Sequence, residues 1–244
     1  MDNSIIWTLN DSPNEDAWQQ CLSPQEREKF ADLRFPKRQR DWLLGRWTAK
    51  ELLLKHPELH NRYQAQELTI ANREQGAPYV LLPQKQELPG CLSISHSHNR
   101  AFCAYTPNSA LSIGADLEKI EAHPQYFIED YFTPFEIEQY LGMTKERHPL
   151  YSTLFWSSKE AVLKALHQGL HRDTREVELD LTSIEPTAWF EGRWLEGRVK
   201  LPVIEGRGWQ LWLQRHDDFV LTIAALYPSG TTSLNPIILT PLVA

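Results

Sequence analysis

The sequence has few of the features that mark a secreted or membrane protein. It contains three cysteines, an odd number with no metal-binding spacing, which favours a reducing compartment over a disulfide framework. The first residues, MDNSIIWTLND, have neither the basic nor the apolar stretch of a signal peptide, and no apolar run approaches the ~20 residues that span a bilayer. We therefore expect a cytoplasmic chain with no membrane segment.

An excess of positive charge is also missing. The formal net charge is −7 at pH 7, whereas general nucleic-acid binding requires a broad basic surface, so we expect no nucleic-acid partner. The basic residues concentrate in LRFPKRQRDWLLGR, residues 33–46. This run fits either a solvated helix face or a local site for phosphate groups.

What the 244 residues do contain is an internal repeat. Residues 47–55 read WTAKELLLK and residues 156–164 read WSSKEAVLK, and both fit W-x-x-K-E-x-x-L-K. A capping-box sequence precedes each copy at nearly the same distance, SPQE at 23–26 and TPFE at 133–136. In both, Ser or Thr is the expected N-cap, Pro the first helical residue and Glu the third.

Strand patterns follow both copies in the same order. ELTIA at 67–71 corresponds to EVELDL at 176–181, and AFCAYTP at 101–107 corresponds to FVLTIAALYP at 219–228. We therefore predict an α+β fold of two pseudo-symmetric halves, each with a small antiparallel sheet packed against a long helix. The predicted boundaries are 1–109, 110–228 and a C-terminal tail, 229–244.

An acidic pair distinguishes the second half. In SIGADLEKI, residues 112–120, a strand would place Asp116 and Glu118 on one face, about 6–7 Å apart. The strand that opens the first half, SIIWTL, carries no carboxylate. A structural device would tend to occur in both copies, so the pair points to a site.

The second copy of the repeat carries residues that suit the same site. Trp156, Glu160 and Lys164 fall on one helical face, where Glu160 and Lys164 alone could be a surface pair worth about 0.3–0.5 kcal/mol. If this helix packs across the strand, Asp116, Glu118 and Glu160 supply three oxygen donors, which suit Mg²⁺ beside a diphosphate. A nearby lysine would then neutralise a leaving phosphate.

Two histidines lie close together in CLSISHSHNRAFCAY, residues 91–105. His96 and His98 are two apart on an expected strand. They could form part of a metal site, although soft-metal chemistry would need further nitrogen or sulfur ligands. The alternatives are a phosphate contact or a hydrogen-bonded core position.

Four segments in order resemble one known family: REQGAPY (73–79), SISHS (93–97), GADLEK (114–119) and WSSKEAVLK (156–164). Residues 23–170 resemble the 4′-phosphopantetheinyl transferases of the surfactin-synthetase-activating type. The resemblance implies a monomer with holo-[acyl-carrier-protein] synthase activity. Such an enzyme transfers 4′-phosphopantetheine from coenzyme A to a serine of an apo acyl or peptidyl carrier protein and releases adenosine 3′,5′-bisphosphate.

The resemblance also implies roles for single residues. Asp116 and Glu118 match the Mg²⁺ ligands of the family. Glu160 matches a third ligand and the candidate base for the serine, and Lys164 matches the residue that stabilises or protonates the leaving group. The residues that match coenzyme A contacts are Lys29, Arg40, Arg46, Gly76, Pro78, Ser95, His96 and Lys164.

Two positions depart from the family pattern. Ala77 stands where relatives commonly have a lysine, and Glu26 where some have a basic residue. The contact to the 3′-phosphate of coenzyme A must therefore be made by the remaining cluster of Lys29, Arg40, Arg46 and His96.

Two other functions share parts of the pattern. A Mg²⁺-dependent nuclease or phosphodiesterase uses similar carboxylates and lysine, and an inactive scaffold could bind carrier proteins, for which residues 121–141 are the expected docking segment.

Overall fold

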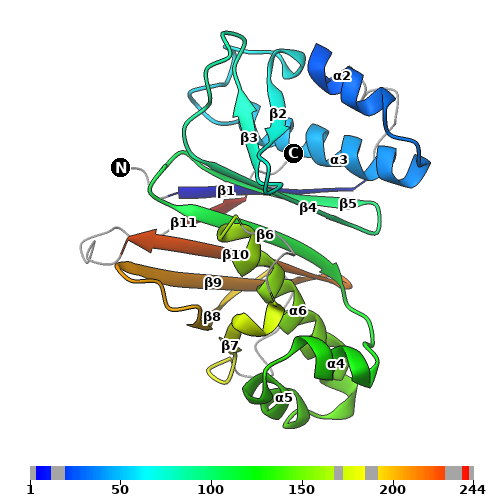
Figure 1. The fold of residues 1–244 in the computed structure, drawn as a ribbon, viewed down its shortest axis with the longest axis vertical. Coiled ribbons are helices and arrows are strands. Elements are labelled where there is room, and N and C mark those ends of the chain that lie inside the picture. Colours follow the sequence, from blue (N-terminus) through cyan, green and yellow to red (C-terminus); the bar gives the residue numbers. More distant parts are fainter. Residues whose placement is uncertain (1–3, 12–19, 168–172, 185–191, 229–237, 242–244) are drawn as a thin grey trace. The chain divides into compact units, whose positions relative to one another are not determined.

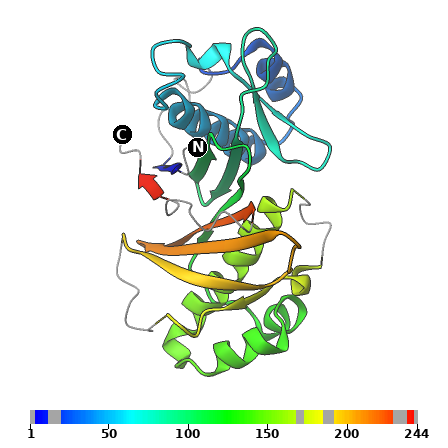
Figure 2. The same cartoon turned by 90° about the vertical axis from the view of Figure 1, so that its left-hand side faces the viewer.

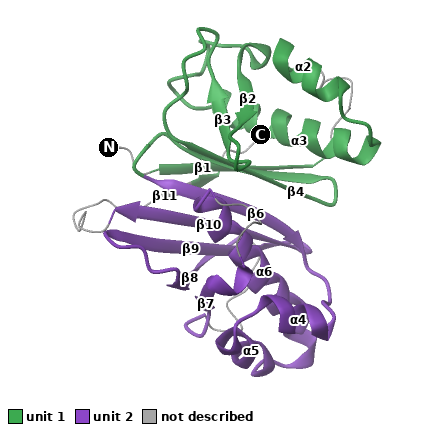
Figure 3. Ribbon diagram, viewed as in Figure 1, with its two compact units in different colours: residues 1–110, 233–244 green, residues 111–232 purple. Residues whose placement is uncertain are grey.

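The chain folds as two units with the same order of elements in the computed structural model (Figure 3). Unit 1 comprises residues 1–110 and 233–244, and unit 2 comprises residues 111–232. The structure describes all residues except 1–3, 12–19, 168–172, 185–191, 229–237 and 242–244. Within the described ranges, no helix is long and apolar enough to cross a bilayer.

Unit 1 is built on a four-stranded sheet of order β11-β1-β5-β4, and its helices lie on one side of that sheet (Figure 1). Helix α3 approaches β4 closely, since a Cβ at Gly45 would lie 3.1 Å from Ile94 Cγ2. The described elements are β1 (Ser4–Asp11), α2 (Pro24–Ala31), α3 (Pro36–Leu54), η1 (Ala65–Glu67), β2 (Thr69–Asn72), β3 (Pro78–Leu81), β4 (Cys91–Ser97), β5 (Arg100–Thr106) and β11 (Ile238–Pro241).

Unit 2 is built on a five-stranded sheet of order β6-β10-β9-β8-β7, with α6 along one face (Figure 2). Antiparallel pairing joins β6 to β10 and β10 to β9. The described elements are β6 (Ser112–Lys119), α4 (Gln125–Tyr131), α5 (Pro134–Leu141), η2 (Lys145–Arg147), α6 (His148–Ala165), η4 (Thr174–Glu176), β7 (Glu178–Asp180), β8 (Trp194–Leu201), β9 (Arg207–His216) and β10 (Phe219–Pro228).

The predicted α+β class and the repeated order of elements are confirmed. In both units a strand precedes a capping-box helix, a long helix and antiparallel strands. Both capping boxes form: Ser23 Oγ accepts from Glu26 N at 3.3 Å, and Thr133 Oγ1 accepts from Glu136 N at 3.3 Å. The units differ in their sheets, because β2–β3 is a separate hairpin whereas β7 and β8 extend the large sheet. Unit 2 also contains α4 before its capping-box helix and η2 before its long helix.

Three local expectations change. The sequence predicts no element in the tail, and in the structure residues 238–241 form β11, which pairs in parallel with β1. His98 has a φ of 48° in the turn between β4 and β5, so the strand carries His96 without His98. Pro78, which in relatives belongs to a loop at the adenine end of coenzyme A by the family resemblance, is here the first residue of β3 and pairs with Asn72 across the hairpin.

Candidate active site

The strand β6 presents its acidic face to helix α6. Gly114, Asp116 and Glu118 are every second residue of the strand and therefore share this face. A Cβ at Gly114 would lie 1.9 Å from Ala161 O of the helix. Only glycine lets the two backbones approach this closely. Asp116 is therefore buried, with 2% of its surface exposed.

The helix face that the sequence singled out meets this strand face. Lys164 Nζ lies 2.6 Å from Asp116 Oδ1 and donates to Ala115 O at 3.2 Å. Trp156 Nε1 donates to Glu118 Oε1 at 3.2 Å. Glu160 lies between Trp156 and Lys164 on the helix, one turn from each. The helix thus packs across the strand, which was the condition for a joint site.

Burial dominates the electrostatics of the two glutamates. It raises the pKa of Glu118 to about 7, with the negative charge of Asp116 as the next cause. It raises the pKa of Glu160 to about 7 in the same way, and Lys164 acts against this rise. These carboxyls carry more negative charge than one ammonium group stabilises, so a cation would favour their ionised forms.

The donor set fits a hard divalent cation. Three carboxylates without His or Cys are the ligands that Mg²⁺ prefers, and Glu160 Oε1 is buried without a hydrogen-bond partner among the described residues. In the side-chain positions described, no group of three or more His, Cys, Asp and Glu is close enough to hold an ion. In this arrangement the carboxylate of Asp116 is paired with the ammonium group of Lys164.

A second feature, in unit 1, is a pocket of about 450 Å³ where α3 crosses β4. Its lining combines cations with aromatic rings: Phe35, Lys37, Arg38, Asp41, Trp42, Gly45, Arg46, Ile94 and His96. Arg46 is only 7% exposed, and burial lowers its pKa. Its guanidinium lies 4.4 Å from the Trp42 ring centroid, and its buried Nε has no hydrogen-bond partner among the described residues.

The pocket gathers some of the predicted coenzyme A residues and not others. Arg46 and His96 line it, whereas Lys29 and Arg40 are exposed on α2 and α3 outside it. Ser95 is buried, and alternation along β4 places it on the face opposite His96.

The turn between β2 and β3 is tied to the pocket arginine. Arg46 Nη2 donates to Asn72 Oδ1 at 2.8 Å, and Asn72 Nδ2 donates to Gly76 O at 2.7 Å. Gly76 has a φ of 91°, a conformation that favours glycine, and Pro78 begins the next strand. Gly76 and Pro78 therefore belong to the hairpin that Arg46 anchors.

Several pocket residues carry no individual assignment from the sequence. The basic run at residues 33–46 predicts no role for Lys37, Arg38 or Trp42 by itself, and in the structure all three line the pocket. Arg38, Trp42 and Arg46 are spaced four residues apart on α3 and so share one face, a signal that the sequence contained.

The capping-box role predicted for Glu26 is confirmed. This residue is the capping-box glutamate, 2% exposed, and it forms an ion pair with Lys50. It also accepts from Ser23 N at 2.9 Å and Ile70 N at 3.0 Å. The carboxylate of Glu26 is thus used within the fold of unit 1.

Comparisons with known proteins agree on one family. Residues 112–224 match the family model described as the 4′-phosphopantetheinyl transferase superfamily. The 4′-phosphopantetheinyl transferase HetI of Nostoc sp. (strain PCC 7120 / SAG 25.82 / UTEX 2576) is 26% identical over 199 residues, which cover 78% of this chain and 81% of HetI. The holo-[acyl-carrier-protein] synthase of Petrotoga mobilis (strain DSM 10674 / SJ95) is 30% identical over 102 residues, which cover 39% of this chain and 84% of that protein.

A solved structure also matches part of the chain. It is the holo-(acyl-carrier-protein) synthase from Bacillus anthracis str. Ames in complex with CoA (3′,5′-ADP). The match has 20% identity and a TM-score of 0.38, and covers 48% of this chain and 96% of that one.

Proposed function

The chain belongs to the 4′-phosphopantetheinyl transferase superfamily, and from this membership we propose that it transfers 4′-phosphopantetheine from coenzyme A to a serine of an apo acyl or peptidyl carrier protein. The serine oxygen bonds to the phosphorus that bears pantetheine. The bond from that phosphorus to adenosine 3′,5′-bisphosphate breaks, and the serine proton passes to a base. Family membership favours this reaction over the nuclease and scaffold alternatives.

The catalytic and metal-binding roles that we assign are supported by the contact between α6 and the acidic face of β6. Asp116, Glu118 and Glu160 would hold Mg²⁺, which supplies positive charge beside the diphosphate when bound. Glu160 accepts the serine proton, directly or through a water, because a carboxylate accepts a proton in its ionised form, which a bound cation would favour. Lys164, with its ammonium on Asp116, stabilises or protonates the leaving phosphate.

The pocket of unit 1 supports a separate role in coenzyme A binding. Arg46, Arg38, Lys37 and His96 bring cationic groups or hydrogen-bond donors to one cavity, and Trp42 adds an aromatic ring. We assign this pocket to the 3′-phosphate and adenosine end of coenzyme A. Ala77, which replaces a lysine of relatives, is then compensated by the cations of α3.

A direct assay tests the proposal. The purified chain is incubated with coenzyme A, Mg²⁺ and apo carriers of the fatty-acid, polyketide and peptide-synthetase types. We expect at least one carrier to gain the mass of one phosphopantetheine, and the gain to disappear when its acceptor serine is replaced by alanine. No mass gain on any carrier would contradict the proposal.

We further propose that the enzyme is a cytoplasmic monomer. Analytical sedimentation would test the oligomeric state, and cell fractionation would test the compartment.

A further inference from the structure

Each copy of the repeated W-x-x-K-E motif contains a lysine that is almost completely buried. Lys50 on α3 is 1% exposed and Lys159 on α6 is 0% exposed. Removing an ammonium group from water is costly unless charge pairing and hydrogen bonds compensate. The contacts of the two lysines show how each unit provides that compensation.

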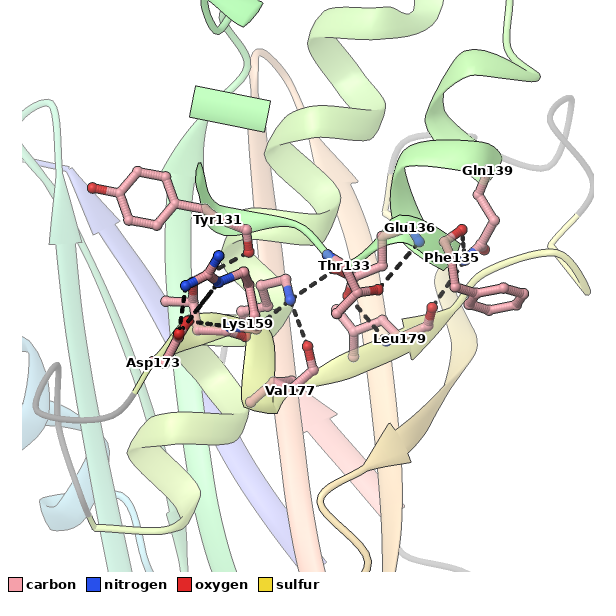
Figure 4. Close-up of polar contacts among 11 residues, drawn as sticks. Tyr131, Thr133, Phe135, Glu136, Gln139, Lys159, Asp173, Val177 and Leu179 are labelled. Carbon is pink, nitrogen blue, oxygen red and sulfur yellow. Dashed lines mark hydrogen bonds and ion pairs between the residues drawn. The ribbon is translucent and has the colours of Figure 1, made fainter. Parts of the chain in front are cut away.

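In unit 2, Lys159 reaches three acceptors at once (Figure 4). Its Nζ lies 2.8 Å from Glu136 Oε2, donates to Thr174 O at 3.0 Å and also donates to Val177 O. These acceptors can use all three of its N–H groups. The ion pair therefore joins α6 to the start of α5 and to the segment from η4 to β7.

Glu136 is fixed with equal completeness. Its Oε2 accepts from Thr133 N at 2.8 Å, and its Oε1 accepts from Leu179 N at 3.0 Å (Figure 4). The capping box of α5 thus closes on its own N-cap, on β7 and on the lysine of α6. A side chain held in this way leaves α6 little freedom to rotate about its axis.

Unit 1 contains the same arrangement. Lys50 forms an ion pair with Glu26 and donates to Cys21 O at 2.7 Å, while Glu26 accepts from the N-cap Ser23 and from Ile70 of β2. This pairing explains why the capping box and the motif are separated by nearly the same distance in both copies. The residues that follow the two lysines differ in surroundings: Glu51 accepts from Asn10 Nδ2 of β1 at 2.8 Å, whereas Glu160 lies opposite the acidic face of β6.

We propose that Lys159 is a positioning residue for phosphopantetheine transfer: its buried ion pair with Glu136 sets the rotation of α6 and so directs Glu160 and Lys164 toward Asp116 and Glu118. This inference rests on the proposed function. Adjacent helical residues point about 100° apart, so fixing Lys159 also fixes the direction of Glu160. Lys50, by the same logic, holds α3 without directing any group of the acidic site.

The repeat supplies a matched control for the test. Lys159→Met and Lys50→Met each leave a buried glutamate without its lysine, so both should lower the melting temperature by similar amounts. With wild type as reference, kcat and the KM for coenzyme A are measured at a temperature where circular dichroism shows each variant folded. We expect Lys159→Met to lose roughly 100-fold in kcat with little change in KM, and Lys50→Met to keep kcat within about three-fold.

A second pair of variants separates positioning from stability and covers failure to fold. Lys159→Met with Glu136→Gln leaves no charge unpaired, so the melting temperature should recover while kcat stays low, because the contacts that orient α6 are still missing. Glu136→Gln and Glu26→Gln are a milder pair of variants, for which we again expect kcat to fall in the unit 2 variant and to be retained in the unit 1 variant. Equal kcat for the two lysine variants, or recovery of kcat together with melting temperature, would overturn the inference.

A readout independent of activity keeps the two hypotheses distinct. Trp156 shares a helix face with Glu160 and bonds to Glu118, so its indole NMR signal, assigned with Trp156→Phe, reports the orientation of that face. It should shift in Lys159→Met and remain in place in Lys50→Met. If wild type transfers nothing, the proposed function fails, while an unshifted Trp156 signal in Lys159→Met would reject the positioning role.

Discussion

Glu160 combines properties that a surface residue would not have. Its Oε1 is buried without a hydrogen-bond partner in the described part of the chain, and burial raises its pKa to about 7. An isolated surface ion pair would show neither property. Burying a carboxylate without a hydrogen-bond partner destabilises the folded state. At the scale of single residues, a role in metal binding or catalysis would explain why the chain has such a group.

Replacing Glu160 tests that view. Glu160→Gln should lower the transfer rate by about 10²–10⁴-fold, since it removes a base and a metal ligand. It should not lower the free energy of unfolding by more than about 1 kcal/mol, because no strongly stabilising ion pair is lost and burial disfavours the carboxylate that is removed. Kinetics and urea unfolding of one preparation measure both quantities. Glu51→Gln, the matched position in unit 1, should keep the rate within about three-fold.

The raised pKa values predict how stability depends on pH without metal. Glu118 and Glu160 hold their protons up to about pH 7 in the folded chain, whereas the unfolded chain releases them near 4.5. Between these values the folded state binds more protons, so the free energy of unfolding falls as pH rises from about 4.5 to 7. Below this window both states are protonated and the two groups contribute no slope.

Thermal melts in EDTA across this range measure the effect. The contribution of the two glutamates should make the wild-type melting temperature fall more steeply with pH than that of Glu160→Gln. Added Mg²⁺ should reduce the fall, because a bound cation favours the ionised carboxylates. Identical pH profiles for wild type and Glu160→Gln would show that Glu160 titrates normally.

At the scale of elements, α3 combines two roles on successive turns. Arg38, Trp42 and Arg46 line the pocket, and Lys50 forms its ion pair one turn after Arg46. The hairpin β2–β3 is attached to the pocket arginine through Asn72. A single helix thus connects the capping box of unit 1 to its cationic pocket.

This arrangement predicts how the pocket distinguishes coenzyme A from dephospho-coenzyme A. Wild type should bind coenzyme A more tightly, and added salt should narrow the difference because the contact is ionic. Arg46→Met should remove most of the preference, whereas Lys29→Met should leave it nearly intact since Lys29 lies outside the pocket. Calorimetric titrations at two salt concentrations measure both. Equal affinity of wild type for the two ligands at low salt would contradict the assignment.

At the scale of the whole molecule, two similar units present different polar groups. Asp116 and Glu118 of β6 have no counterparts on β1, whose sequence is SIIWTLND with its one carboxylate, Asp11, in an ion pair with Arg100 at the strand end. The cationic pocket, in turn, was found in unit 1. The repeat therefore preserves a structural pairing of lysine and glutamate while the functional groups have diverged.

A stoichiometry follows from this division. We expect one coenzyme A per chain and a single Mg²⁺-dependent activity that EDTA abolishes and Asp116→Ala removes without unfolding the chain. Titration calorimetry of wild type and circular dichroism of Asp116→Ala check the two parts. Two coenzyme A molecules per chain, or full activity in EDTA, would contradict the assignment of one acidic site.

Local patterns in the sequence were sufficient to predict much of this protein. Capping boxes, strand alternation and the helical spacing of Trp156, Glu160 and Lys164 depend on residues a few positions apart, and the structure confirms these elements. The alternation in residues 113–118 also identified which side chains share a face of β6. Such patterns are readable because backbone geometry alone decides them.

Tertiary structure decided which partner each face meets. No local pattern predicts that the first lysine of each motif is buried, but Lys50 and Lys159 are buried because distant capping boxes supply their counter-ions. The pairing of β11 with β1 joins the two ends of the chain, and no local pattern marks it. These outcomes depend on contacts between residues far apart in the sequence, where the free energy of burial, rather than local propensity, selects the arrangement.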